Sequence, residues 1–177
     1  MEVIRSSLDL ANPIPIDISS VESEYSRFYP ITPLSDLSSP IVFVVSSSSH
    51  HYLQFSDSFL YISGNILNVD GSKITTTTLA APSNDFLSSL FSGCEIEQNG
   101  TLVSTTATLY PYRAHLVKLL SQDYGYKKSN AQAEMWFDDE KQDVFDATNP
   151  GFGTRSTFAK GPKRFETIGK VTQSLYN

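Results

Sequence analysis

Apolar residues follow strand patterns in two early segments of the chain. Residues 41–45 form an unbroken β-branched and aromatic run, which predicts a strand buried on both faces. Residues 59–69 predict a longer strand that presents three aliphatic side chains on one face: Leu60, Ile62 and Ile66. Asp70-Gly71 then predicts a tight turn, because this pair tolerates positive φ angles.

The clearest local signal is a hairpin centred on Asn99-Gly100. Asn-Gly is the preferred pair for a two-residue turn of type I′, and strand-like arms flank it on both sides. With these two residues as the loop, we expect Gln98 to pair with Thr101 and Ile96 to pair with Val103.

Two short segments show the apolar spacing of helices. Residues 85–91 have room for a couple of turns, with one apolar stripe: Phe86, Leu87, Leu90 and Phe91. A second pattern follows Pro111, which suits the first position of a helix, and Tyr124-Gly125-Tyr126 is expected to end it. The apolar side predicted for this helix consists of Leu116, Val117, Leu119 and Leu120.

Strand patterns return near the C-terminus, after an acidic, loop-like region at residues 138–151. They cover residues 154–159 and 165–175. Many short strands, turn-rich connections and one or two brief helices predict a mainly β fold of the sandwich or jelly-roll type. A jelly roll has eight strands, which is more than these patterns supply, so we expect the chain to form only part of one.

The first forty residues differ from the rest because five prolines interrupt both helices and strands: Pro13, Pro15, Pro30, Pro33 and Pro40. We interpret residues 1–40 as an extended arm, with a short strand near residues 14–18, and residues 41–177 as the β domain. The arm is either a floppy terminus or an extension that reaches a neighbouring subunit.

Length and charge narrow the classes of function. The 177 residues suffice for one domain, and the net charge of -6 disfavours a surface that reads nucleic acid directly. The single Cys94 forms no internal disulfide. No segment has the apolar core of a signal peptide or the roughly 18 apolar residues of a membrane-spanning helix. Synthesis as a soluble intracellular protein is therefore expected.

Histidine and cysteine provide two candidate sites. His50-His51, with Asp57 nearby, lacks the further His or Cys ligands that a structural zinc ion takes. Cys94 is a potential nucleophile with His115 as its base. A single cysteine in a strand is more often a small buried apolar residue, and this is the interpretation we favour.

One acidic segment and one glycine-containing segment resemble parts of a calcium-binding loop and of a dinucleotide-binding motif, but each lacks essential features of that site. The acidic run lacks the spacing of a calcium-binding loop, so a solvated loop is expected; its residues are Glu134, Asp138, Asp139 and Glu140. Gly151-Phe152-Gly153 resembles part of a dinucleotide fingerprint, but no strand-to-helix crossover surrounds it. We predict no catalytic residue, no cofactor and no metal, and therefore no enzyme.

A succession of short strings in the second part of the chain is similar to a known family. In chain order these are Ala81-Pro82-Ser83-Asn84, Leu90-Phe91, Asn99-Gly100, Leu102-Val103-Ser104, Tyr110-Pro111-Tyr112-Arg113-Ala114, Leu119-Leu120, Lys128-Ser129, Trp136-Phe137-Asp138-Asp139, Gly151-Phe152, Arg155, Phe165 and Ile168-Gly169. Their order and spacing resemble the double jelly-roll major capsid proteins of Polinton (Maverick) elements and adintovirus-like viruses, over roughly residues 40–177.

This resemblance implies a structural subunit of an icosahedral capsid, located in the virion or encoded by an endogenous viral element. The family builds its shell from trimers with two jelly rolls per chain, and this chain would supply the N-terminal part of the first. The implied partners are copies of itself and other capsid proteins. Two alternatives stay open: a glycan- or protein-binding β-sandwich module, and the single jelly-roll penton protein of the same viruses.

Overall fold

The computed structural model describes residues 22–35, 39–46, 52–105, 109–141, 143–161 and 163–170. The chain divides into two compact units, Met1–Tyr52 and Leu53–Asn177. Every helix and strand of the described residues belongs to the second unit. The strand expected near residues 14–18 lies outside the described residues.

The described part of the first unit is extended chain without a strand. The backbone N–H of Ile31 donates to the carbonyl oxygen of Val42 at 2.9 Å, and the backbone N–H of Val42 donates to Thr32 Oγ1 at 3.1 Å. Four apolar residues here are 37% to 55% exposed: Ile41, Val42, Phe43 and Val44. The predicted buried strand at residues 41–45 is wrong, because no sheet forms among the described residues of this unit for the run to join.

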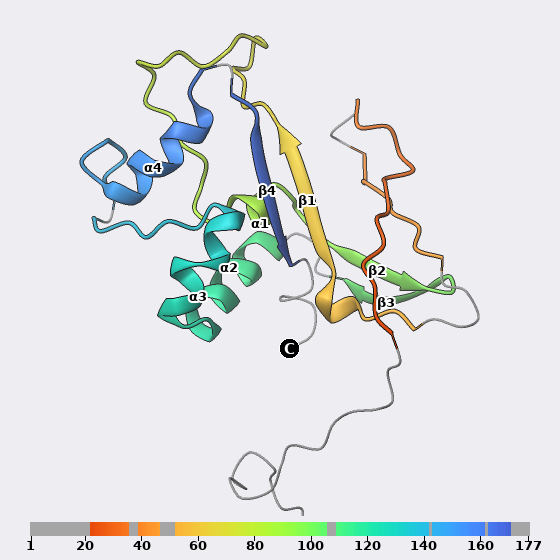
Figure 1. Cartoon of the computed structure of the whole chain (residues 1–177). Coiled ribbons are helices and arrows are strands. Elements are labelled where there is room, and N and C mark those ends of the chain that lie inside the picture. Colours follow the sequence, from red (N-terminus) through yellow and green to blue (C-terminus); the bar gives the residue numbers. More distant parts are fainter. Residues whose placement is uncertain are drawn as a thin grey trace, which may run out of the picture. The chain divides into compact units, whose positions relative to one another are not determined.

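An antiparallel pair of strands runs through the second unit. β1 (Phe59–Gly64) pairs along its length with β4 (Phe165–Lys170), and the two strands lie side by side in Figure 1. Along β4, Phe165, Thr167 and Gly169 are buried, whereas Glu166 and Ile168 are exposed. This alternation confirms the strand that the sequence predicts from residue 165, over its described part.

β1 is shorter than the sequence predicts, because the chain leaves the sheet after Gly64. Leu67 and Lys73 instead form an isolated bridge around a tight turn. In that turn the backbone N–H of Gly71, whose φ is +79°, donates to the carbonyl oxygen of Asn68 at 2.9 Å. The predicted Asp-Gly turn is confirmed.

The second sheet is the hairpin of β2 (Glu95–Gln98) and β3 (Thr101–Thr105). Asn99 and Gly100 have φ angles of 51° and 75°, as a type I′ turn requires, and Gln98 pairs with Thr101 as predicted. Ile96 pairs with Ser104 and not with Val103, because a bulge between Ile96 and Glu97 shifts the register.

Short helices connect the strands. They are η2 (Phe55–Asp57), α1 (Phe86–Ser89), α2 (Tyr110–Ser121), α3 (Tyr124–Lys128), η3 (Asn130–Glu134) and α4 (Pro150–Ala159). α1 and α2 confirm the two predicted helices. α3 forms where only a helix end was expected, since Asp123 Oδ1 caps it by accepting from the backbone N–H of Tyr126 at 2.8 Å.

α4 replaces the strand predicted at residues 154–159, so that prediction is wrong. The helix begins at Pro150, whose fixed φ angle favours a first turn. Two threonine hydroxyls donate to backbone carbonyls within the helix: Thr154 Oγ1 to Pro150 at 3.0 Å and Thr157 Oγ1 to Thr154 at 2.8 Å. These bonds accommodate residues that otherwise favour strands.

α2 buries a different face from the one predicted. Its fully buried residues are Tyr110, Ala114 and Lys118. Leu120 is 81% exposed, and Leu116 and Leu119 are also exposed. The helix therefore directs a lysine into the core and leaves leucines on its surface.

Helices and sheet share one core in the second unit. α1 and η3 both pack against β4, and Phe86 of α1 meets Phe165 of β4 edge to face, with ring centroids 5.2 Å apart. The described residues form a mixed α/β arrangement with two small antiparallel sheets. Short antiparallel strands with brief helices are confirmed, but the helices are more prominent than a mainly β fold implies. The two packed sheets of a jelly roll are not found among the described residues.

Candidate functional site

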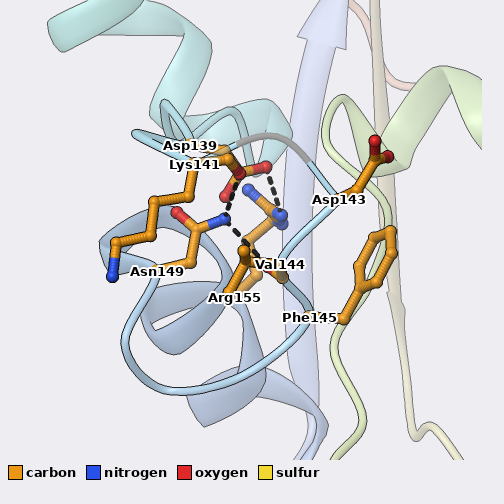
Figure 2. A pocket seen from close by; sticks show the side chains of 7 residues that line it. All are labelled: Asp139, Lys141, Asp143, Val144, Phe145, Asn149 and Arg155. Atoms are coloured by element: carbon orange, nitrogen blue, oxygen red, sulfur yellow. Dashed lines mark hydrogen bonds and ion pairs between the residues drawn. The ribbon is translucent and has the colours of Figure 1, made fainter.

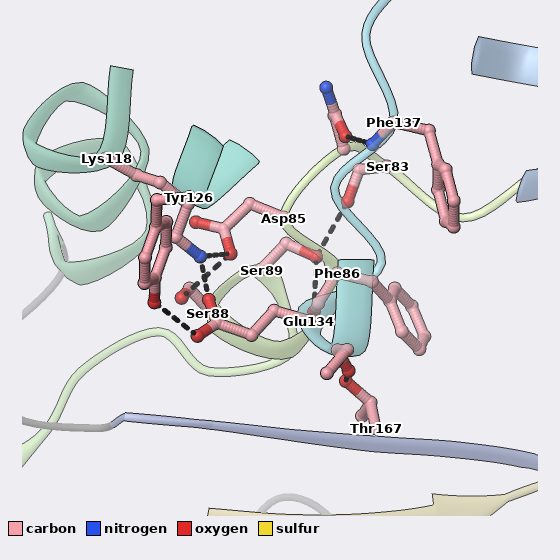
Figure 3. A network of polar contacts seen from close by, with 12 residues as sticks. Ser83, Asp85, Phe86, Ser88, Ser89, Lys118, Tyr126, Glu134, Phe137 and Thr167 are labelled. Atoms are coloured by element: carbon pink, nitrogen blue, oxygen red, sulfur yellow. Dashed lines mark hydrogen bonds and ion pairs between the residues drawn. The ribbon is translucent and has the colours of Figure 1, made fainter. Parts of the chain in front are cut away.

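A buried cluster of three charged side chains lies between the helices and β4. Asp85 immediately precedes α1, Lys118 lies on the buried face of α2, and Glu134 ends η3. Lys118 Nζ donates to Asp85 Oδ1 and to Glu134 Oε2, as Figure 3 shows. All three side chains are only 2% to 5% exposed. Water is therefore largely excluded from this ion cluster.

Further polar groups surround the ion cluster. Tyr126 Oη donates to Glu134 Oε1 at 3.5 Å, and Ser88 Oγ donates to Asp85 Oδ1 at 3.3 Å (Figure 3). Thr167 Oγ1 of β4 donates to the carbonyl oxygen next to Glu134, that of Ala133, at 2.8 Å. Asp85 Oδ2 is buried and has no hydrogen-bond partner among the described residues. One carboxylate oxygen of the ion cluster is thus left unsatisfied, which is uncommon in a folded core.

The charges of the ion cluster do not balance, since two carboxylates face one ammonium. Burial raises the pKa of Glu134, and the attraction of Lys118 only partly opposes this effect. Burial by itself lowers the pKa of Lys118, but the adjacent Asp85 and Glu134 outweigh burial and raise it. The raised pKa values of Glu134 and Lys118 both favour the retention of an extra proton. That proton brings the net charge of the buried ion cluster closer to zero.

Trp136 covers one side of the ion cluster. Its ring is 3% exposed, with Lys118 Nζ 6.0 Å from the ring centroid. His115 stacks on the same ring at 5.1 Å with an interplanar angle of 29°, and the indole N–H donates to Asp138 Oδ1 at 2.9 Å. The aromatic wall and its hydrogen bond keep solvent away from Lys118.

A second buried group, Arg155 of α4, connects three segments. Its Nε donates to the carbonyl oxygen of Pro82 at 3.1 Å, its Nη1 to the carbonyl oxygen of Phe137 at 2.7 Å, and its Nη2 to Asp139 Oδ2 at 2.8 Å. The guanidinium group is therefore fully engaged within the protein. Its fork geometry suits this task, because it satisfies several acceptors at once.

A hollow of about 310 Å³ opens beside Arg155 (Figure 2). It is lined by Asp139, Lys141, Asp143, Val144, Phe145, Asn149 and Arg155. Asn149 Nδ2 donates to the carbonyl oxygens of Lys141 and Val144, both at 3.0 Å, and Asn149 Oδ1 accepts from the backbone N–H of Glu140 at 3.1 Å. Asn149 and Arg155 thus hold the loop in place, and their polar atoms are already used.

The structure separates the acidic run that the sequence predicts as a solvated loop. Asp138, Asp139 and Glu140 are exposed, in agreement with the prediction, and Asp138 pairs with Lys128 at 3.3 Å. Glu134 is not part of the loop, because it is buried in the ion cluster. Among the residues that the structure describes, no group of three or more His, Cys, Asp or Glu side chains is arranged to hold a metal ion.

The other predicted candidates lie at separate places. His50 and His51 fall outside the described residues, whereas nearby Asp57 pairs with Lys170 at 2.7 Å. Cys94 is half-buried just before β2, where burial raises the pKa of its thiol and disfavours the thiolate nucleophile. His115 lies on α2 against Trp136. Gly151 contributes to packing, since a side chain there would come within 2.5 Å of the Asp138 carbonyl oxygen.

Apolar side chains gather on the solvent side of the β1–β4 sheet. We call this the outer sheet face; its residues are Phe59 (49% exposed), Tyr61 (57%) and Ile168 (43%). Tyr61 lies directly opposite Ile168 in the ladder. Within the described part of the chain β1 and β4 have only each other as hydrogen-bonded neighbours, so each leaves one strand edge open.

Comparisons with protein-family models, with curated proteins and with solved structures find no match. In the part of the chain that the structure describes, no helix has both the length and the apolar character needed to span a membrane.

Proposed function

We propose that this protein is a structural subunit of a viral or virus-like icosahedral capsid and acts by associating with copies of itself and with other capsid proteins. The observation that carries the proposal is the outer sheet face, where Phe59, Tyr61 and Ile168 expose apolar surface on a sheet that has only two strands in the described part of the chain. Such a face with open edges favours burial against another chain or domain.

The interior supports a structural role as well. The charged groups of the ion cluster bond to one another, and Arg155 bonds to backbone carbonyls and to Asp139. These groups stabilise the packing of the helices against β4. The surface, in contrast, exposes apolar side chains on the outer sheet face, and association would bury them.

The resemblance to double jelly-roll capsid proteins gives the proposal its specific form. Two of the sequence strings that carry the resemblance contribute buried residues. Tyr110 and Ala114, from the string at residues 110–114, lie on the buried face of α2, and Trp136, from the string at residues 136–139, covers the ion cluster. In this form of the proposal the chain belongs to a trimeric capsomer, its location is the virion, and the outer sheet face packs against a further β layer.

The test is the self-association of the 177-residue protein, measured by light scattering across a concentration range and viewed by negative-stain electron microscopy. We expect trimers and larger regular assemblies. Tyr61→Lys combined with Ile168→Lys should weaken association by about tenfold or more, because two apolar contacts are replaced by repelling charges. Leu120→Lys is the control, since it changes an even more exposed apolar residue that lies on α2 and not on the sheet.

A protein that stays monomeric at every concentration, with no difference between the variants, would contradict the proposal. Saturable binding of glycans by such a monomer would favour a binding module instead. Circular dichroism of each variant separates a loss of association from a loss of fold.

A further inference from the structure

We propose that the ion cluster is a site of self-catalysed cross-linking, in which Lys118 Nζ and Asp85 Cγ become joined by an amide bond with Glu134 as the catalytic residue. This activity is independent of the proposed capsid role. It would fix the start of α1 covalently to α2.

The reacting groups already meet the geometric requirement. Lys118 Nζ contacts Asp85 Oδ1, so Nζ lies next to Cγ, the carbon that it would attack. Reacting atoms held about 3–3.5 Å apart in a fixed orientation gain a large rate advantage over the same groups in solution. The two residues are 33 positions apart in the sequence, so the folded core supplies this proximity.

The second requirement is a neutral amine facing a neutral carboxyl group; the neighbouring carboxylates raise the pKa of Lys118, so this pair forms only by proton transfer inside the buried site. In water Lys118 and Asp85 would form a hydrated ion pair and would not condense. Here their side chains are 4% and 2% exposed, and Trp136 covers the ammonium group. Transfer of a proton from Nζ to Asp85 removes two charges from a low-dielectric site, which lowers the cost of forming the reactive pair.

Glu134 is placed to move the protons. Its Oε2 contacts Lys118 Nζ, and its Oε1 is held by Tyr126 Oη at 3.5 Å. A carboxyl group in hydrogen-bond contact with a nucleophile is positioned for general acid–base catalysis. Burial raises the pKa of Glu134, which makes this carboxylate a stronger base than an exposed one.

The step balances in atoms and charge. Nζ attacks Cγ of the protonated Asp85, and a C–N bond forms as Glu134 accepts a proton from nitrogen. Glu134 then returns that proton to an Asp85 hydroxyl, the C–O bond breaks, and one water molecule leaves. Glu134 ends unchanged, and the reaction uses no oxidant or reductant.

Intact mass spectrometry of the denatured wild-type protein tests the proposal directly. We expect a mass lower than that of the sequence by one water molecule, and a branched tryptic peptide that joins the segments containing Asp85 and Lys118. Lys118→Arg keeps the positive charge but has no equivalent amine, so it should show the full sequence mass. Glu134→Gln keeps the shape but cannot shuttle the proton, so it should also show the full mass.

Asp85→Asn gives the sharpest comparison. An amide at this position reacts with the same lysine but releases ammonia, so this variant should lose the mass of one ammonia molecule and give the same final product as wild type. Loss of water from the Asp85→Asn protein would place the reaction elsewhere. Succinimide formation at Asp70-Gly71 also releases water, but it produces no branched peptide and persists in Lys118→Arg.

Full sequence mass in the wild-type protein, without a branched peptide, overturns the proposal. So does a branched peptide that joins any other pair of residues. Both results are read from the wild-type protein, so they remain decisive even if a variant fails to fold.

Discussion

Gly169 of β4 lies directly against the side chain of Glu134. A Cβ atom at position 169 would come within 2.5 Å of Glu134 Cδ and 2.6 Å of Glu134 Oε1. The strand can pass this closely beneath the ion cluster only because position 169 has no side chain. The ion cluster and the β1–β4 sheet are therefore sterically coupled.

Gly169→Ala should destabilise the fold by about 1–3 kcal/mol, because the methyl group displaces Glu134 from Lys118. The matched control is Gly153→Ala in α4, where a Cβ would meet its nearest neighbour at an ordinary 3.7 Å. That change should stabilise the helix by roughly 0.5–1 kcal/mol. Urea unfolding measures the free energy of unfolding of both variants. Equal effects of the two substitutions would contradict the steric coupling between the ion cluster and the β1–β4 sheet.

Arg155→Lys should lower the free energy of unfolding by about 2–4 kcal/mol, because one ammonium group cannot replace three directed guanidinium bonds. The carbonyl oxygens of Pro82 and Phe137 would lose their donors. Arg164→Lys is the control: Arg164 is exposed and donates to Ser63 Oγ, so its replacement should change stability by less than about 0.5 kcal/mol. Comparable losses in the two variants would argue against Arg155 as a structural connector.

The pH dependence of stability should carry a contribution from Glu134. Burial raises its pKa above the ordinary value of 4.5 in the folded protein, so the folded state binds this proton more tightly than the unfolded state. The contribution is fully present below pH 4.5 and is lost as pH rises through the folded pKa. We therefore expect wild type to lose stability relative to Glu134→Gln as pH rises.

Urea unfolding of both proteins between about pH 4 and pH 8 measures this difference. Subtraction of the two curves removes the contribution of the surface carboxylates. Among these, Asp138 has a pKa lowered by its hydrogen bond from Trp136, which produces the opposite slope. Parallel curves for wild type and Glu134→Gln would show that the pKa of Glu134 is the same in both states.

Cys94 should react slowly with iodoacetamide in the folded protein. Burial raises the pKa of its thiol, and the nearby Glu95 adds to this effect, so little thiolate is present near neutral pH. Cys94 is the single cysteine, so the mass increase on alkylation reports on this site alone. The rate should rise when urea unfolds the chain; equal rates in both states would contradict burial of the thiol.

Local turn chemistry explains which parts of the fold follow from the sequence. The Asn99-Gly100 and Asp70-Gly71 turns depend on residues a few positions apart, and both form as expected. The predicted strand alternation also holds over its described part, Phe165–Lys170, because one face of β4 is buried against helices. Such patterns depend on short-range geometry that is visible in the sequence itself.

The wrong predictions concern features that depend on contacts between residues far apart in the sequence. Lys118 occupies the buried face of α2 because Asp85 and Glu134, which are 33 and 16 positions away, neutralise it. No periodicity in the sequence indicates that a lysine is buried there. The sequence therefore predicted the leucines of this helix, such as Leu116 and Leu120, as its core residues. Residues 41–45 have the composition of a buried strand, but a strand also needs a neighbouring strand, and composition does not supply one.

The pairing of Gly64 with Phe165 has a consequence for how fast the chain folds. The two residues are about a hundred positions apart, and both the β2–β3 hairpin and the ion cluster lie within the loop that their pairing closes. Closing so long a loop adds little to the equilibrium cost but slows folding, because distant contacts must be found by diffusion. The hairpin should therefore form early and the β1–β4 ladder late, so newly made chains pass through a state in which the helices have no sheet to pack against.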